Sequence, residues 1–230
     1  MHPSCPNKRG FTLVELLVVI AIMAIVTAIS VPSIFSLTNS GKMNQTASEL
    51  AGLLEQARQY AVAQNTYVWV MFNTQTANNT DTLAVGVVAS TDGSDPGTFG
   101  ASPSPNFTVP SANLILVTKI RTFPQFQLQS PGSYSFAVPA SLPTSPVTGP
   151  ANALATNATF NIQIPGNSST TSFNEFVQFT PSGEARNSSS PIDIVEFGID
   201  PAQTHTTPNN NNVAVLQVNG ITGQGIVYRK

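Results

Sequence analysis

The sequence predicts an α+β fold in which a long N-terminal α-helix, membrane-spanning in its first half, packs on an antiparallel β-sheet or β-sandwich domain. An apolar run with a single ionisable residue covers residues 11–29. Apolar residues then recur at helical spacing to about residue 64. Beyond that point, short segments rich in Val, Ile, Phe and Thr alternate with turn residues.

The composition excludes several function classes. Only 9% of the 230 residues are charged, against roughly 25% in ordinary soluble proteins. Ser, Thr, Asn and Gln must therefore supply the polar surface, which is typical of exported proteins. Cys5 is the only cysteine, so an intramolecular disulfide and a Cys-type zinc site are excluded. His2 and His205 are the only histidines, which is too few for a His-rich metal site or a relay of histidines.

The apolar run, Phe11 to Ile29, has the length of a membrane helix. About 20 helical residues span a hydrocarbon core of roughly 30 Å, and a continuous helix satisfies its own backbone groups in lipid. Lys8 and Arg9 precede the run and should hold its N-terminal end in the cytoplasm by the positive-inside rule. Residues after about 35 then lie outside.

Glu15 is the only ionisable residue in the run. A cleaved secretory signal, with a possible cut site at residues 28–30, and a plain membrane anchor both leave this acid unexplained. A carboxylate at membrane depth costs on the order of 2.5–3.5 kcal/mol on insertion scales, so it usually has a role. The simplest alternative is that Glu15, close to the interface, only reaches the headgroups.

Residues 8–16, KRGFTLVEL, resemble the class III signal of type IV pilins and type II secretion pseudopilins. That signal has a basic leader, a glycine, a hydrophobic residue that is usually phenylalanine, and a glutamate as the fifth residue after the cut. The resemblance implies that residues 1–10 are a prepilin leader, which a membrane peptidase removes between Gly10 and Phe11. It also implies N-methylation of the new Phe11 amine.

The same resemblance implies that subunits assemble into a filament by helix packing. Cleavage creates a positive amine at the end of an apolar helix, and burial of this amine requires an opposite charge. Glu15 of a neighbouring subunit can supply that charge, and the pair would set the register between subunits. The expected packing residues are Leu13, Val14, Leu16, Leu17 and Ile20.

The helix should continue beyond the membrane. Residues 11–35 form the transmembrane and assembly half, and residues 36–65 form an amphipathic half. Its apolar face comprises Leu50, Leu53, Leu54, Ala57, Tyr60 and Ala61, at spacings of three and four. Pro32 should kink the helix because it removes one backbone hydrogen bond, or else it ends a simple membrane helix.

Residues 66–230 are predicted to be a periplasmic antiparallel β domain. The predicted strands cover residues 66–73, 82–90, 113–120, 133–138, 158–164, 173–179, 192–199, 213–219 and 224–230. No second helix is evident. Residues 90–106 and 139–157 are rich in Pro, Ser and Thr and are predicted to be long, mobile surface loops.

Downstream segments resemble H-type minor pseudopilins and FimT-like minor pilins. Residues 48–73 resemble their passage from helix to first strand, with the Ala57-Arg58 pair. Residues 176–186 resemble their strand and hairpin, matched by Phe179, Pro181 and Gly183. Residues 219–230 resemble their closing strand after a glycine. The long loops and sparse charge depart from this pattern.

The sequence does not predict catalysis, a cofactor or a metal site. The acids of the β domain are scattered over turns and strands, and no G-x-S-x-G motif marks a nucleophile. Residues 92–95, DGSD, hint at calcium but lack the EF-hand spacing, so a plain turn is the favoured interpretation.

Nucleic acid is not an expected partner. Arg229 and Lys230 could touch two phosphates, but no basic patch with aromatic residues accompanies them. They are the only residues that support the first alternative function, a DNA-binding minor pilin for DNA uptake. The second alternative is a signal-anchored surface protein.

The expected function is therefore a structural minor pilin or pseudopilin subunit of a type II secretion or type IV pilus-like filament. Its location would be the bacterial inner membrane as a single-pass protein, and then the filament. The implied partners are other pilin or pseudopilin subunits, the prepilin peptidase and methylase, the inner membrane, and the secretion or pilus assembly machinery.

Overall fold

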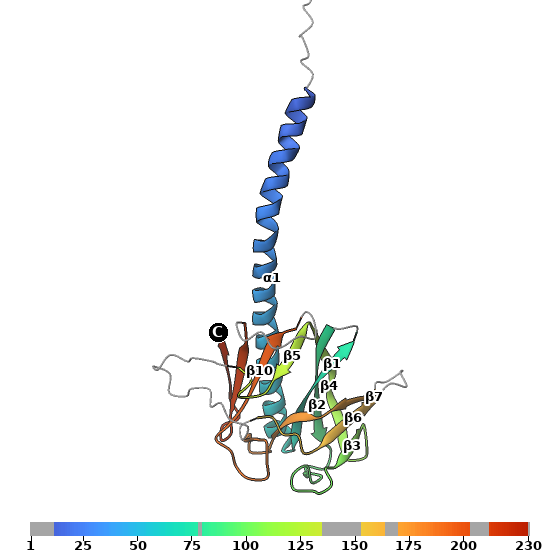
Figure 1. The fold of residues 1–230 in the computed structure, drawn as a ribbon. Helices are drawn as coiled ribbons and strands as arrows, with labels where there is room; N and C mark the ends of the chain where they lie inside the picture. Colours follow the sequence, from blue (N-terminus) through green and yellow to red (C-terminus); the bar gives the residue numbers. More distant parts are fainter. Residues whose placement is uncertain (1–11, 78–79, 135–152, 164–169, 203–211, 230) are drawn as a thin grey trace, which may run out of the picture. The chain divides into compact units, whose positions relative to one another are not determined.

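The computed structural model describes residues 12–77, 80–134, 153–163, 170–202 and 212–229, without the side chains of residues 28–40 and 77 (Figure 1). The chain divides into two compact units, residues 1–42 and residues 43–230. They are called the N-terminal unit and the C-terminal unit below, and each is described by itself.

The predicted helix is confirmed as α1, Leu13–Gln64. It ends where Asn65 adopts a left-handed backbone conformation, with φ of 50°. The Thr66 N–H then donates to the Ala61 carbonyl at 3.0 Å. This arrangement is a helix C-cap in which asparagine takes the place usually held by glycine.

The described residues of the C-terminal unit form three β-sheets. The five-stranded sheet has the order β4-β2-β1-β8-β9, with β1 (Val68–Ala77), β2 (Thr80–Ser90), β4 (Leu114–Pro124), β8 (Glu175–Phe179) and β9 (Ala185–Arg186). The four-stranded sheet has the order β12-β11-β10-β5, with β5 (Phe126–Gln129), β10 (Ile194–Pro201), β11 (Ala214–Asn219) and β12 (Gly225–Arg229). The three-stranded sheet has the order β3-β6-β7, with β3 (Asn106–Val109), β6 (Thr159–Gln163) and β7 (Thr170–Phe173).

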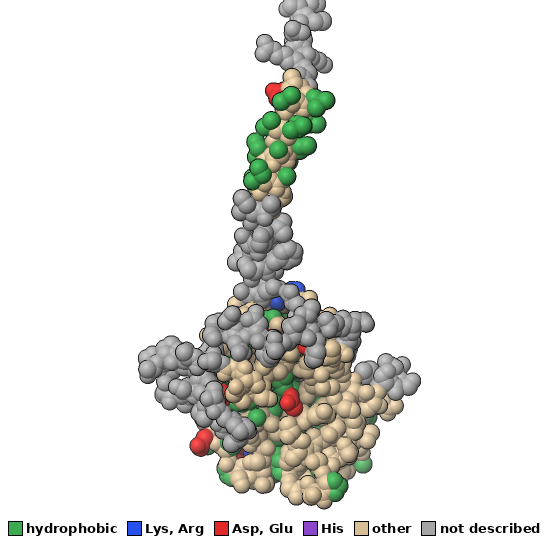
Figure 2. Space-filling view, viewed as in Figure 1, with side chains coloured by type: hydrophobic (Ala, Val, Ile, Leu, Met, Phe, Trp, Pro, Cys, Tyr) green, Lys and Arg blue, Asp and Glu red, His purple; other side chains and the backbone are tan. Residues whose placement is uncertain are grey.

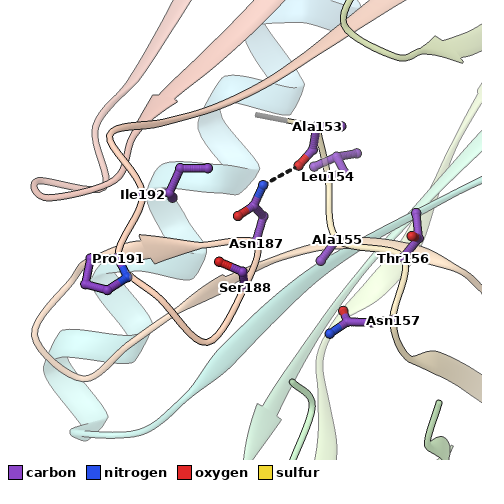
Figure 3. Close-up of a pocket in the computed structure, with 9 residues that line it drawn as sticks. All are labelled: Ala153, Leu154, Ala155, Thr156, Asn157, Asn187, Ser188, Pro191 and Ile192. Atoms are coloured by element: carbon purple, nitrogen blue, oxygen red, sulfur yellow. Dashed lines mark hydrogen bonds between the residues drawn. The ribbon is translucent and has the colours of Figure 1, made fainter. Parts of the chain in front are cut away.

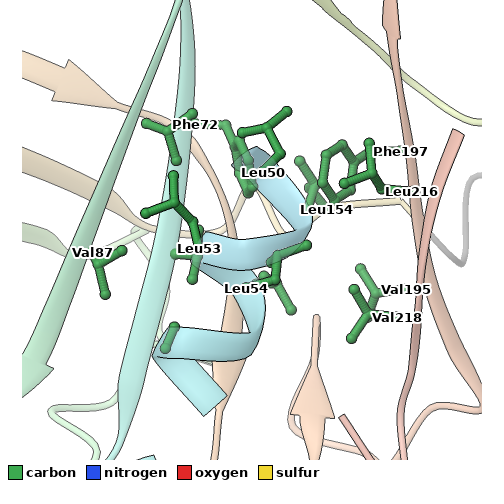
Figure 4. Packing of buried hydrophobic residues seen from close by; sticks show 14 of the residues in the cluster. Leu50, Leu53, Leu54, Phe72, Val87, Leu154, Val195, Phe197, Leu216 and Val218 are labelled. Atoms are coloured by element: carbon green, nitrogen blue, oxygen red, sulfur yellow. The ribbon is translucent and has the colours of Figure 1, made fainter. Parts of the chain in front are cut away.

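The two larger sheets enclose the helix in one apolar core. Leu50, Leu53 and Leu54 of α1 lie among side chains from both sheets (Figure 4). The rings of Phe72 on β1 and Phe197 on β10 are 4.8 Å apart between centroids. The amphipathic half of the helix is therefore the centre of the C-terminal unit, as the spacing of its apolar residues predicts.

A second core lies on the other face of the five-stranded sheet. Trp69 and Met71 of β1 point away from the helix and pack with Phe160 and Phe176. The ring centroids of Trp69 and Phe160 are 5.9 Å apart. Because both faces of β1 are covered, its sequence is a continuous apolar run rather than an alternating one.

Most strand predictions are confirmed, and the exceptions are short. Strands β3, β5, β7 and β9 are not among the predicted strands, apart from Phe173 at the end of β7. The β3–β6 pair is parallel, whereas the other pairs are antiparallel. Residues 91–105 contain no strand, as predicted, but they do not all lie at the surface, because Thr98 is fully buried.

The predicted strand at 133–138 is described only at Ser133 and Tyr134, which are not in a strand. Its remainder, most of the predicted loop 139–157, and His205 lie outside the described residues.

Candidate functional site

The N-terminus of α1 is closed by a reciprocal pair of side chains. The Thr12 N–H and the Thr12 hydroxyl both donate to Glu15 Oε2, each at 3.0 Å. In return the Glu15 N–H donates to Thr12 Oγ1 at 3.2 Å. This is a capping box, in which two otherwise unsatisfied backbone N–H groups find partners. The carboxylate expected to act in assembly is therefore held in one place.

The first turns of α1 expose apolar side chains within the N-terminal unit. The predicted packing residues range from 55% exposed at Leu17 to 80% exposed at Leu13. Figure 2 shows apolar groups along this part of the helix and an acidic group at its start. A surface of this kind calls for an apolar environment or a partner.

Thr27 is a polar residue in this apolar stretch. Its hydroxyl donates to the Ala24 carbonyl at 3.1 Å, so its hydrogen-bonding need is met within its own helix.

Within the described residues, no helix is both long enough and apolar enough to cross a membrane.

Several predicted site residues lie outside the described part of the chain. They are Lys8, Arg9, Gly10, Phe11 and Lys230. Pro32 falls within the bounds of α1, but its side chain also lies outside the described residues, and the kink stays a prediction.

The residues that carry the subgroup resemblance come together around Arg58. Its side chain lies close to two turns, each of which contains a glycine. A methyl group added at Gly223 would place its Cβ 2.7 Å from Arg58 Cδ, and one added at Gly183 would place its Cβ 3.7 Å from Arg58 Nη1. Arg58 also binds Glu55 through two hydrogen bonds of 2.6 and 2.9 Å, which lower the pKa of the Glu55 carboxyl. Arg58 therefore packs against the turns at Gly183 and Gly223, which indicates a structural role.

The loop that hinted at calcium uses its acids internally. Asp92 Oδ1 accepts hydrogen bonds from Ser90, Ser94 and the Ser94 N–H, and the pKa of Asp92 is lowered to about 2, first by the Ser94 hydroxyl. Asp95 accepts from Gly97, Thr98 and Gln178. Among the described residues no cluster of His, Cys, Asp and Glu could hold a metal ion. The arrangement is that of a self-capped turn.

A buried carboxyl lies on the outer face of the four-stranded sheet. Glu196 is fully buried and accepts from the Tyr134 hydroxyl at 2.8 Å. Gln217 and Tyr228 extend the network, with a Tyr228 to Gln217 bond of 3.3 Å. Burial and the Glu196 charge raise the pKa of Tyr134, so its hydroxyl stays a donor. The network is a satisfied polar cluster.

Glu175, at the start of β8, offers a test of charge burial. Burial raises the pKa of its carboxyl above the usual range. Because the raised pKa belongs to the folded state, ionisation costs stability, and this cost appears as the pH rises through the folded pKa. We expect Glu175→Gln to stabilise the C-terminal unit more at pH 7 than at pH 4, as measured by denaturant unfolding. An equal change at both pH values would contradict this account.

The C-terminal cation Arg229 is not fully free to meet a phosphate. Its side chain is half-buried and donates to Asn212 Oδ1 at 3.2 Å, and burial lowers the pKa of its guanidinium. Lys230 lies outside the described residues, and the prediction stays that nucleic acid is not an expected partner.

Thr12 is a helix-capping residue that the sequence interpretation missed. Its signal was present, because Thr12-Leu13-Val14-Glu15 has the Ser/Thr-x-x-Glu pattern that precedes an apolar helix.

Comparison with known proteins agrees with this part of the chain. The model of the prokaryotic N-terminal methylation motif matches residues 5–31. No curated protein and no solved structure matches the chain significantly.

The motif implies processing by prepilin peptidase, anchoring in the inner membrane before filament assembly, and assembly with pilins. The C-terminal unit, with its helix packed against antiparallel sheets, has a pilin-like α+β fold. The chain therefore carries a prokaryotic N-terminal methylation motif at residues 5–31, the motif of type IV prepilin-like proteins.

Proposed function

We propose that this protein is a minor pseudopilin of the H type, a subunit of a type II secretion or type IV pilus-like filament. The observation that carries the proposal is the methylation motif on a helix whose start exposes apolar side chains around one acid. The contacts of Arg58 with the turns at Gly183 and Gly223 support the subgroup, because they bring its separate sequence signatures together.

The geometry at the helix start suits a charge pair between subunits. Cleavage between Gly10 and Phe11 would produce an amine, and methylation would leave it positive. Both Thr12 donors bind Glu15 Oε2. Oε1 accepts no hydrogen bond from the described residues and would be available to the Phe11 amine of a neighbour. Packing of the apolar side chains would bury the pair, and a buried charge without its partner is strongly unfavourable. Correct register would then be the arrangement in which both charges are satisfied.

The remainder of the chain would act as a periplasmic domain. The N-terminus would lie in the cytoplasm, residues 11–35 would cross the inner membrane, and the β domain would contact other minor subunits or cargo. The alternatives, DNA uptake and a signal-anchored surface protein, lack a comparable supporting observation in the structure.

Mass spectrometry of the protein purified from its native membrane tests the proposal. We expect the mature chain to begin at Phe11 and to carry a methyl group on that amine. Cells that lack the prepilin peptidase are the control, and their protein should retain residues 1–10. A mature chain that keeps its leader in normal cells, or one cut near residue 30, would overturn the filament role.

A further inference from the structure

A hollow of about 420 Å³ lies between residues 153–157 and residues 187–192 of the C-terminal unit (Figure 3). None of the described residues that line it is charged. Its Asn187 Nδ2 group already donates to the Ala153 carbonyl at 2.7 Å. This hollow therefore presents no charge that would select a partner, whereas a second hollow does.

The second hollow, of about 380 Å³, lies where α1 ends. Its walls are the last turns of the helix with Tyr60 and Gln64, the loop after β2 with Asp92, and Ile115 near the start of β4. One acid thus stands beside a helix end and two larger side chains with apolar bodies.

Hydrogen bonds fix these walls relative to one another. The Ser90 N–H donates to the Tyr67 carbonyl, just after the helix, and the Thr91 N–H donates to the Asn113 carbonyl, just before β4, each at 2.9 Å. The Thr66 hydroxyl adds a bond of 2.8 Å to the Ser90 carbonyl. The hollow is therefore formed before a partner arrives, which lowers the cost of binding.

Asp92 gives the hollow a fixed negative charge. The hydrogen bonds that it accepts from other described residues all go to Oδ1. Its carboxylate forms no ion pair with a described residue, and its pKa of about 2 keeps it ionised at neutral pH. Oδ2 is thus an oriented acceptor that the described chain does not use.

The end of α1 adds to the negative potential in the hollow. The C-terminal end of a helix carries a partial negative charge, and the last turn of α1 contains no basic residue. Gln64 lines the hollow, and its carbonyl accepts no backbone hydrogen bond in the described part of the chain. A cation from outside would therefore meet both the carboxylate and the helix end.

The apolar walls favour an organic cation over a metal ion. Ile115 is 38% exposed, and Tyr60 is only partly buried. A basic side chain can lay its hydrocarbon stem along such surfaces, and the face of a tyrosine ring attracts a nearby cation. A calcium ion needs about six to eight oxygen ligands, and the described residues offer no cluster of acids of that kind.

Lysine suits this hollow better than arginine. The arginine fork binds a carboxylate through both oxygens, but Asp92 Oδ1 already accepts three hydrogen bonds. A lysine ammonium is a compact charge with three donors. It can bind Oδ2 and a carbonyl of the helix end at the same time.

We propose that this hollow receives a lysine side chain from a different subunit of the filament. Lys119 is the only lysine in the described part of the C-terminal unit. It lies on β4 four residues beyond Ile115, or about 13 Å along the strand, so the C-terminal unit does not fill the hollow with it. The inference rests on the filament role proposed above and gives the β domain a contact of defined chemistry.

Capture of a lysine from a cysteine in the hollow tests this contact. Gln64→Cys in a full-length Cys5→Ser background provides the only cysteine of the chain, at an exposed position. A short linker that joins a thiol to an amine is added to native membranes. We expect an adduct between this chain and a different subunit, in which mass spectrometry finds the linker on a lysine of that subunit.

Two variants control for chance encounters. Ser48→Cys, at an exposed position of α1 outside the hollow, should give less adduct. Asp92→Asn keeps an oxygen for the hydrogen bonds of the turn but removes the charge, so it should lower the Gln64→Cys yield about threefold, as for a partly exposed ion pair. The contact is overturned if Ser48→Cys gives as much adduct, if Asp92→Asn leaves the yield unchanged, or if the captured lysine belongs to a second copy of this chain.

Charge reversal and calcium removal provide the second arm. Asp92→Lys should reduce filament incorporation by about tenfold, because like charges in a contact are costly. An adduct that forms only after calcium is chelated would show that a metal ion is the native occupant and would overturn the proposal. A chain that forms no adduct but is cut and methylated at Phe11 refutes the contact and leaves the filament role intact, whereas a chain that keeps its leader refutes the filament role.

Discussion

Glu15→Ala is expected to leave the protein in the inner membrane while reducing its incorporation into filaments by about tenfold or more. The apolar run is unchanged, so membrane insertion should not suffer. The neighbour's Phe11 amine, however, would be buried without an opposite charge, and a broken buried pair costs about 3–5 kcal/mol. Membrane fractionation and the amount of protein in sheared filaments measure the two effects separately.

Two further variants separate charge from helix capping at this site. Glu15→Gln keeps an oxygen that can accept from Thr12 but removes the charge, so it should fail as Glu15→Ala does. Glu49→Ala removes an exposed acid elsewhere on α1 and should assemble normally. Normal incorporation of Glu15→Gln would show that the cap, and not the charge, is what assembly requires.

Gly220→Ala is expected to destabilise the C-terminal unit by about 3 kcal/mol or more, because the added methyl group meets backbone atoms and cannot be relieved by a side-chain rotation. A Cβ on Gly220 would lie 1.6 Å from the Ile192 carbonyl oxygen. Gly220 also links Ala185 to Asp193 by hydrogen bonds, so a shift there would separate the five-stranded and four-stranded sheets. Denaturant unfolding of the full-length protein in detergent, followed by Trp69 fluorescence, measures the change.

Gly225→Ala is the matched control for this substitution. Gly225 follows in the same segment, and a Cβ there would meet nothing within 4 Å. Its unfolding free energy should therefore stay within about 0.5 kcal/mol of the parent, as for most surface substitutions. Equal effects of the two substitutions would mean that the close approach at Gly220 is relieved by backbone movement.

Local patterns were enough to predict the helix and most strands. The spacing of Leu50, Leu53 and Leu54 gave the buried face of α1, and dense β-branched and aromatic runs gave the central strands. Strand β9 has only two residues and forms because the hairpin turn brings it back to β8. Strand β3 pairs with a segment about fifty residues later in the chain, and such a pairing leaves little local signal.

The candidate sites show the same division between local features, which can be recognised in the sequence, and contacts that only folding creates. The lone acid in an apolar run is a local feature, so Glu15 could be recognised directly. Arg58 stands in a recognisable sequence pattern, yet only the fold reveals that its side chain packs against the turns at Gly183 and Gly223.

Under the charge pairing proposed above, the capping box at Thr12 would lower the entropic cost of joining subunits. A free glutamate samples many rotamers, and immobilising such a side chain during association costs about 0.5–1.5 kcal/mol. In this chain the Glu15 rotamer is already selected when the helix forms, since Thr12 holds one carboxylate oxygen. The entropy loss then precedes the encounter between subunits, and an arriving amine meets an acceptor that is already oriented.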